Sequence, residues 1–142
     1  MTEKPLHSSP FISSKAYREL VFIKLGGSLI TDKNQALHAQ TDLIEQLLTE
    51  LGLFLIQHPE TRVILGHGSG SFGHSVARFY GTREGICDEL GWQGYHEVWR
   101  AARELHDIVM AIGMSFDLPL PLISFPPSAS VSASNRQITT WN

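Results

Sequence analysis

Short apolar runs and helical patterns of apolar residues follow one another along the chain. "LVFIKL", beginning at Leu20, is rich in β-branched and aromatic residues and is broken by "GGS", which predicts a buried strand leading into a tight loop. "RVILGHG", beginning at Arg62, repeats this pattern. The sequence therefore predicts two strands that each end in a glycine loop.

Two longer segments carry apolar residues at helical spacing. The first is predicted to begin near Asp42, with Asp42 and Glu45 as a capping box, and to end before Pro59. The second is predicted over residues 94–113, with Gly113 as its C-terminal cap. The apolar positions are Ile44, Leu47, Leu48, Leu51 and Leu55 in the first segment, and Val98, Ala102, Leu105, Val109 and Ile112 in the second.

The remaining segments complete an α/β pattern. We expect a short helix and a surface excursion in residues 75–92, a third strand around residues 120–124, and the start of an edge strand in "RQITTW". Alternating strands and helices predict a mostly parallel sheet with helices on its faces. Residues 1–17 are rich in Ser, Pro and Lys without periodicity, so we expect a flexible extension before the folded part.

Composition narrows the class of protein. A chain of 142 residues with 42% hydrophobic residues can bury one core, and a net charge of -3 gives no reason to expect nucleic acid. Apolar runs such as Leu53 to Ile56 are too short to span a membrane, and the opening segment lacks the apolar core of a signal peptide. We therefore expect a cytoplasmic protein. Cys87 is the single cysteine, which excludes an internal disulfide, and we interpret it as a buried or half-buried small residue.

The loop "GHGSGSFGHS", residues 66–75, fits two phosphate-binding patterns incompletely. It contains G-x-G-x-x-G, but the acidic residues about 20 positions later, Asp88 and Glu89, follow no predicted strand. It also contains a P-loop pattern in which His74 stands where lysine is expected. Four glycines directly after a strand favour backbone N–H groups that face an anion, although a tight turn without a ligand stays an alternative.

The first loop adds positive charge. In "KLGGSLITDK", Lys24 lies on the predicted strand and Lys33 follows nine residues later. A lysine within an apolar strand is costly without a partner, and a polyphosphate is a suitable one. The alternatives are that Lys24 faces water on an edge strand and that Lys33 is a solvated surface residue. Because both loops follow neighbouring parallel strands, together they indicate phosphoryl transfer.

Three segments carry a resemblance to a known family. "KLGGSLITDK", "GHGSGSFGHSVA" and "LPLISFPPSA" resemble, in order, the amino-acid kinase superfamily over residues 21–129. The histidine after "GSFG" is similar to that of members that phosphorylate isopentenyl phosphate. The resemblance implies an αβα sandwich with a mainly parallel sheet, ATP and Mg²⁺ as cofactors, and conversion of isopentenyl phosphate to isopentenyl diphosphate in isoprenoid biosynthesis through the mevalonate pathway.

The resemblance also implies roles for individual residues. The residues expected at the ATP phosphates are Lys24, Gly26, Gly27, Ser28 and, near the ATP side, Ser69. The residues expected at the acceptor phosphate are Gly68, Gly73 and His74, with Lys33 at the transferred phosphoryl. Lys24, Lys33 and His74 are the expected catalytic residues, and no residue is assigned to a metal. His67 is interpreted as a hydrogen-bonded turn histidine, and His106 receives no function.

An apolar wall for a short hydrocarbon tail is expected after the second loop, from Ala77, Leu90 and Trp92. The alternative for Trp92 is an ordinary core position. A phosphate monoester is largely a dianion near neutral pH, because its second pKa is about 6, so it needs positioning rather than a general base. We therefore expect His74 to donate a hydrogen bond to the acceptor.

Length sets a further expectation. Members of the superfamily have a C-terminal half that holds adenine and ribose, so residues 18–142 are expected to be the N-terminal, acceptor-side half, with the nucleotide-binding half absent. A full-length form is expected to be a homodimer. Two alternatives stay open: a kinase of another phosphonate or phosphate, such as fosfomycin, and a truncated, non-catalytic fragment that binds phosphate or pairs with another chain.

Overall fold

The fold is known from a computed structural model, which describes residues 18–115, 120–125, 131–134 and 137–141. The predicted extension, residues 1–17, lies outside the described residues. In chain order the elements are β1 (Glu19–Leu25), α1 (Gly27–Ile30), α2 (Thr41–Gln57), β2 (Thr61–His67), α3 (Gly70–Tyr80), the 3-10 helix η1 (Thr82–Glu84), α4 (Glu89–Gly113), β3 (Val131–Ser134) and β4 (Gln137–Trp141).

Strands β1 and β2 form a parallel pair, as the sequence predicts. Their register sets Lys24 opposite Gly66 and Leu25 opposite His67, so the two carboxyl ends are level. Helix α2 connects them and ends at Gln57, before Pro59. The predicted α/β fold with parallel strands is therefore confirmed.

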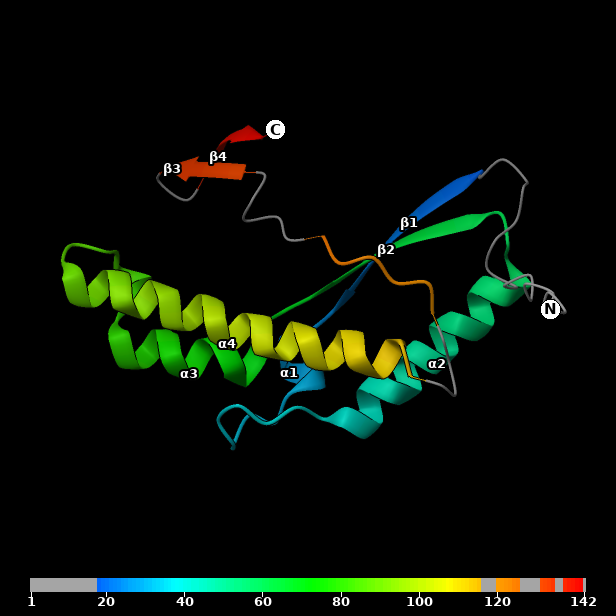
Figure 1. Ribbon diagram of the computed structural model, residues 1–142, viewed down its shortest axis with the longest axis horizontal. Coiled ribbons are helices and arrows are strands. Elements are labelled where there is room, and N and C mark those ends of the chain that lie inside the picture. The colour runs from blue at the N-terminus through cyan, green and yellow to red at the C-terminus, as the bar shows by residue number, and fades with distance from the viewer. Residues whose placement is uncertain (1–17, 116–119, 126–130, 135–136, 142) are drawn as a thin grey trace, which may run out of the picture.

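One face of the strand pair is packed against helices and the other is open. The core joins Leu25 of β1 to Ile44 and Leu48 of α2 and to Leu105 of α4. In Figure 1, α2 and α4 lie on the same side of the two strands. On the opposite face, Phe22 is 72% exposed. Of the expected sandwich, the described residues supply the strands and the helices of one face.

Two helix starts differ from the predictions. The capping box is wrong: α2 begins at Thr41, its N-cap is Gln40, and no side chain caps it. The Gln40 N–H instead donates to the Ile30 carbonyl oxygen, at 2.9 Å, and closes the preceding link. Helix α4 begins at Glu89, five residues before the predicted start, because the carboxylate of Asp88 accepts the N–H of Gly91 at 2.7 Å.

Gly113 does not act as the predicted C-terminal cap. It is the last residue of α4, and the cap position is Met114. A Cβ at Gly113 would lie 2.5 Å from Cδ1 of Leu122, so the glycine gives the Leu122 side chain room to pack directly on the helix. Because this contact involves Leu122, which lies outside the helix, the apolar pattern of the helix does not reveal it.

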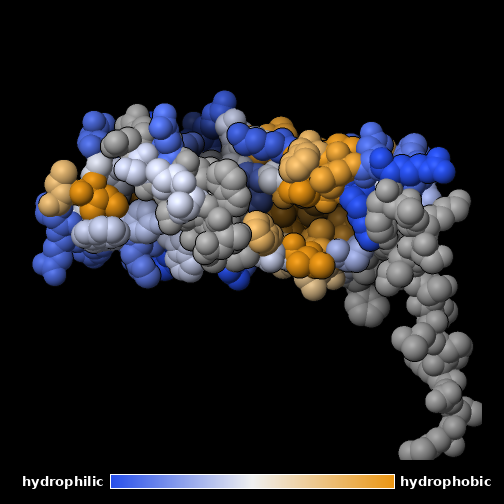
Figure 2. All heavy atoms as spheres, turned by 90° about the horizontal axis from the view of Figure 1, so that it is seen from above, coloured by the Kyte–Doolittle hydropathy of each residue, from blue (hydrophilic) through white to orange (hydrophobic). Residues whose placement is uncertain are grey.

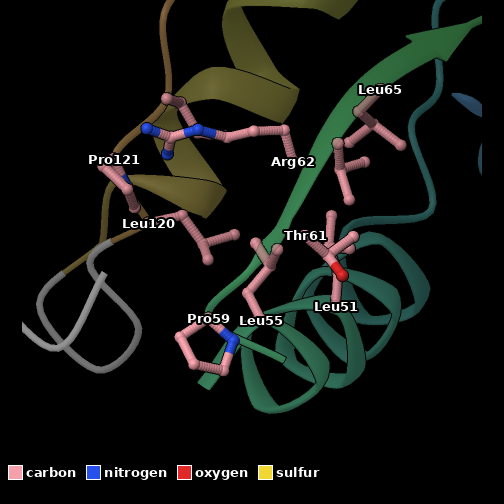
Figure 3. A pocket seen from close by; sticks show the side chains of 10 residues that line it. Leu51, Leu55, Pro59, Thr61, Arg62, Leu65, Leu120 and Pro121 are labelled. Atoms are coloured by element: carbon pink, nitrogen blue, oxygen red, sulfur yellow. The ribbon is translucent and has the colours of Figure 1, made fainter. Parts of the chain in front are cut away.

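The third strand predicted around residues 120–124 is not formed. The N–H of Leu120 donates to Gly113, and that of Leu122 donates to Leu120, so these groups do not pair with β2. Pro121 has no N–H to offer a ladder. A pocket of about 120 Å³ lies between this segment, α2 and the amino-terminal end of β2 (Figure 3), at the opposite end of β2 from the glycine loops.

The carboxyl-terminal strand is present but pairs elsewhere. Strand β4 forms as the "RQITTW" pattern predicts, and it pairs antiparallel with β3 in a separate two-stranded sheet. Cys87 is exposed in the link between η1 and α4, so its interpretation as a buried or half-buried residue is wrong. Within the described ranges, no helix has the length and apolar character to cross a membrane.

The open face of the strand pair predicts self-association. Parallel sheets are normally covered on both faces, yet Leu20, Phe22 and Ile64 are exposed, and Figure 2 shows an apolar area over the strands. We expect the 15.8-kDa chain to sediment above its monomer mass and Phe22→Thr to reduce that association. Phe79→Gln, at an exposed aromatic residue of α3, is the matched control. A monodisperse wild-type monomer would contradict the expectation.

Candidate phosphate-binding site

The two glycine loops lie side by side at the carboxyl end of the strand pair. β1 ends at Leu25 and β2 ends at His67, its partner in the register. The N–H of Gly68 donates to the carbonyl oxygen of Leu25 at 3.0 Å and ties the second loop to the first strand. The predicted neighbourhood of the loops is thus confirmed, at the edge where ligands bind in open α/β sheets.

The loops touch through their backbones. A Cβ at Gly27 would lie 2.4 Å from the amide nitrogen of Gly70, and a Cβ at Gly68 would lie 2.9 Å from that of Gly27. Gly70 also has a φ of +49°, in the left-handed region that favours glycine. Three glycines are therefore required for this contact, and each meets a residue of the other loop.

Thr31 joins the two loops, and the sequence analysis did not single it out. Its hydroxyl donates to the Gly27 carbonyl at 2.7 Å and accepts the Ser71 N–H at 2.9 Å. The residue is only 1% exposed. The sequence does contain a hint of this role, because Thr31 directly follows Leu29 and Ile30. A hydroxyl that is buried with such apolar neighbours must find hydrogen-bond partners.

The start of α3 offers backbone N–H groups to an anion. Phe72 and Gly73 donate to the Ser69 carbonyl, at 3.1 and 3.3 Å. The N–H groups of Ser69 and Gly70 have no acceptor among the residues that the structure describes. Because these groups lie at a helix N-terminus, where the dipole favours negative charge, they can bind a phosphate.

The amides of Gly68 and Gly73, expected at the acceptor phosphate, already have internal partners. Gly73 serves packing, because a Cβ there would lie 2.3 Å from Oγ of Ser69. The Oγ of Ser71 is enclosed and has no hydrogen-bond partner in the described part of the chain. An enclosed, unpaired hydroxyl beside the loop indicates a partner outside the described residues.

His74 lies one turn into α3 and its side chain is exposed. Side chains on a helix lean toward its N-terminus, so the imidazole of His74 is directed toward the first turn of α3. The geometry is suited to a hydrogen bond from His74 to an anion held at the start of α3.

The two lysines of the first loop are exposed. Lys24 lies on the open face of β1, and Lys33 lies in a link closed by the Thr31–Ala39 bridge. Because Lys24 is exposed to water, its charge carries no desolvation cost, and the fold does not require a partner for it. Neither lysine forms an ion pair within the described residues. Both positive charges are therefore available to a ligand.

Gly26 and Ser28 flank the start of α1. The Gly26 carbonyl accepts the N–H groups of Leu29 and Ile30, at 2.9 and 3.3 Å, which fixes the loop, and Ser28 is exposed. Among the described residues, no three His, Cys, Asp or Glu side chains are grouped to hold a metal.

The residues expected to wall a hydrocarbon tail are not brought to the loop. Ala77 is buried within α3, whereas Leu90 and Trp92 are exposed in the first turn of α4. That turn lies by the far end of α3, since a Cβ at Gly94 would be 2.4 Å from Cβ of Tyr80. The far end is about 15 Å from the helix start. Trp92 is also 64% exposed, which excludes an ordinary core position.

Comparison with known proteins decides the family. The family model described as the amino acid kinase family matches residues 19–118. The chain belongs to the amino acid kinase family. Two curated relatives are isopentenyl phosphate kinases: the protein of Methanocaldococcus jannaschii is 34% identical over 128 residues, covering 84% of this chain and 47% of the relative. That of Thermoplasma acidophilum is 33% identical over 110 residues, covering 78% and 42%.

Solved structures agree with this membership. A crystal structure of the T. acidophilum isopentenyl phosphate kinase in a product complex has a TM-score of 0.69 at 29% identity, covering 86% of this chain and 47% of that chain. An isopentenyl phosphate kinase substrate complex has a TM-score of 0.68 at 28% identity, covering 87% and 47%. The chain thus spans about half the length of the relatives that it matches.

The contact between the loops predicts unequal effects of two glycine substitutions. Gly27→Ala places a Cβ against the Gly70 backbone and should lower the free energy of unfolding by about 1–3 kcal/mol. Gly66→Ala is the matched control, because its Cβ has no neighbour closer than 3.9 Å, and it should stay within about 0.5 kcal/mol of wild type. Urea unfolding measures both. Equal losses would show that the loops are not in close contact.

Proposed function

We propose that this chain supplies the acceptor side of an ATP-dependent kinase that converts isopentenyl phosphate to isopentenyl diphosphate. The observation that carries the proposal is the contact between the two glycine loops, with the N–H groups of Ser69 and Gly70 unpaired within the described residues. Loops held this way can place two phosphates next to each other. Isopentenyl phosphate is proposed as the acceptor because both curated relatives are isopentenyl phosphate kinases.

The acceptor phosphate is proposed to lie at the start of α3. The N–H groups of Ser69 and Gly70 bind its oxygens, and the exposed His74 donates a hydrogen bond. No general base is needed, because a monoester with a second pKa of about 6 already presents an anionic oxygen. The chain's contribution is position and charge neutralisation, which are the main requirements of phosphoryl transfer.

The first loop is proposed to hold the donor. ATP supplies the transferred phosphoryl group, and its phosphates fit a loop in which Gly26, Gly27 and Ser28 follow the strand directly. Lys24 and Lys33 offer the positive charges. A Mg²⁺ ion, the second proposed cofactor, would be held mainly by phosphate oxygens. Adenine and ribose contacts are assigned to the part of the relatives that this chain does not match.

Two other functions each have an observation in their favour. Leu90 and Trp92 lie away from the loop, which favours a kinase of another phosphonate or phosphate, such as fosfomycin. The N–H groups of Ser69 and Gly70, which have no acceptor among the described residues, are also consistent with a non-catalytic chain that only binds phosphate. A cytoplasmic location, a role in the mevalonate pathway and a homodimer in the longer form belong to the primary proposal.

A chimera tests the proposed function. The chain is joined to the half of the M. jannaschii relative that it does not match, and ATP-dependent product formation is measured. We expect isopentenyl diphosphate to form, with a catalytic efficiency about ten- to a hundredfold above that for fosfomycin. Equal catalytic efficiencies for the two compounds would refute isopentenyl phosphate as the preferred substrate. Phosphate binding without turnover in a folded chimera would favour the non-catalytic chain.

His74 variants test the acceptor site in the same chimera. A hydrogen bond to a charged oxygen contributes about 1.5–3 kcal/mol, so His74→Ala should lower catalytic efficiency by about ten- to a hundredfold or more. His74→Gln keeps a donor and should recover part of that loss. His96→Ala, at an exposed histidine of α4, is the control and should match wild type. If glutamine were no better than alanine, hydrogen-bond donation by His74 would be refuted.

A further inference from the structure

Three side chains from separate parts of the chain form a continuous row beside the second loop. Nε2 of His67 lies 3.2 Å from Nδ1 of His106, and Nε2 of His106 lies 2.7 Å from Oγ of Ser124. At the other end, Nδ1 of His67 lies 3.4 Å from the carbonyl oxygen of Gly68. The row links the end of β2, the middle of α4 and the segment after α4.

The carbonyl of Gly68 fixes the direction of the hydrogen bonds. A carbonyl oxygen only accepts, so Nδ1 of His67 carries the proton, and Nε2 of the neutral ring accepts from Nδ1–H of His106. Nε2 of His106 then accepts the hydroxyl proton of Ser124. With both rings neutral, every ring nitrogen of the row has one partner.

The surroundings of His106 favour its neutral form. Burial lowers the pKa of His106 below its ordinary value, and electrostatic interactions with His67 and Arg103 lower it further, whereas Asp107 raises it. Arg103 and Asp107 form an ion pair with each other on α4 at 2.8 Å. Because the folded pKa is depressed, the stability contributed by neutral His106 is present above about pH 6.5 and is lost as pH falls below it.

The row acts on the peptide that joins Gly68 to Ser69. In a trans peptide the carbonyl oxygen and the next N–H lie on opposite edges of one plane. A hydrogen bond from His67 to the Gly68 oxygen therefore also orients the Ser69 N–H. That N–H has no acceptor in the described part of the chain.

We propose that His67, His106 and Ser124 form a positioning row that holds the Gly68–Ser69 peptide in the orientation in which the loop presents its N–H to phosphate. The identity of the ligand rests on the proposed function, whereas the effect on the loop backbone does not. In this proposal His67 orients the loop peptide in addition to forming a hydrogen bond in the turn. His106 supports that orientation, although its position in the sequence does not reveal this role.

Nuclear magnetic resonance of the ¹⁵N-labelled 142-residue chain at neutral to mildly alkaline pH tests the row. We expect both His67 and His106 to be in the Nδ1–H tautomer. His106→Asn keeps a donor near Nδ1, whereas His106→Gln extends toward Nε2 and loses it. The Ser69 and Gly70 amide resonances should therefore stay near wild type in the asparagine variant and move in the glutamine variant. His96→Gln on the same helix is the matched control.

Binding of isopentenyl phosphate, measured by calorimetry, is the second measurement. Loss of the row should weaken affinity about three- to tenfold in His106→Gln and His106→Ala, and less than about twofold in His106→Asn. An Nε2–H tautomer of His67 in the wild-type chain overturns the proposal. So do loop amides that respond to His106→Gln no more than to His96→Gln.

The two measurements separate this proposal from the proposed function. If the tautomers and loop amides behave as expected but wild type does not bind isopentenyl phosphate, the substrate assignment fails and the positioning row stands. If wild type binds isopentenyl phosphate and all His106 variants bind it equally, the row is refuted and the substrate assignment stands.

Discussion

Gly27 and Gly70 lie so close together that neither can carry a side chain, and Thr31 holds this contact with one hydroxyl that bonds both loops. The contact brings the carboxyl ends of β1 and β2 into one site, because each loop continues directly from its strand. It also uses the Ser71 N–H, so that the Ser69 and Gly70 amides are left at the start of α3. The candidate phosphate site follows from this single packing arrangement.

The same arrangement separates residues that hold the loops from residues that can meet a ligand. The N–H groups of Gly68 and Gly73 bond to backbone carbonyls, and a Cβ at either glycine would collide with neighbouring atoms. The Thr31 hydroxyl likewise bonds within the protein. His74, Lys24 and Lys33 are exposed and form no ion pair within the described ranges. Phosphoryl transfer needs both kinds of residue, since charges stabilise a transferring group only when the backbone that carries them is fixed.

Among the described residues, the strand pair is covered by helices on one face only. Parallel strands normally have both faces covered, and here Phe22 and Ile64 are exposed. The helices α2 and α4 cover the other face, so the core of the described residues is built on one side. The glycine loops lie at the carboxyl edge of this half-covered sheet, where ligands bind in open α/β sheets.

Local pattern in the sequence determined both parallel strands, the existence of α2 and α4, and the two glycine loops, because strand periodicity, helical periodicity and glycine clusters are short-range signals. It also indicated Lys24, Lys33 and His74 as candidates. Tertiary structure alone decided that α2 begins after Gln40 without a side-chain cap, that Gly113 serves packing, that residues 120–125 do not pair with β2, and that Trp92 lies away from the loop. Thr31 and the row from His67 to Ser124 also depend on tertiary structure, since their partners lie 18 to 40 residues apart in sequence and only packing brings them together.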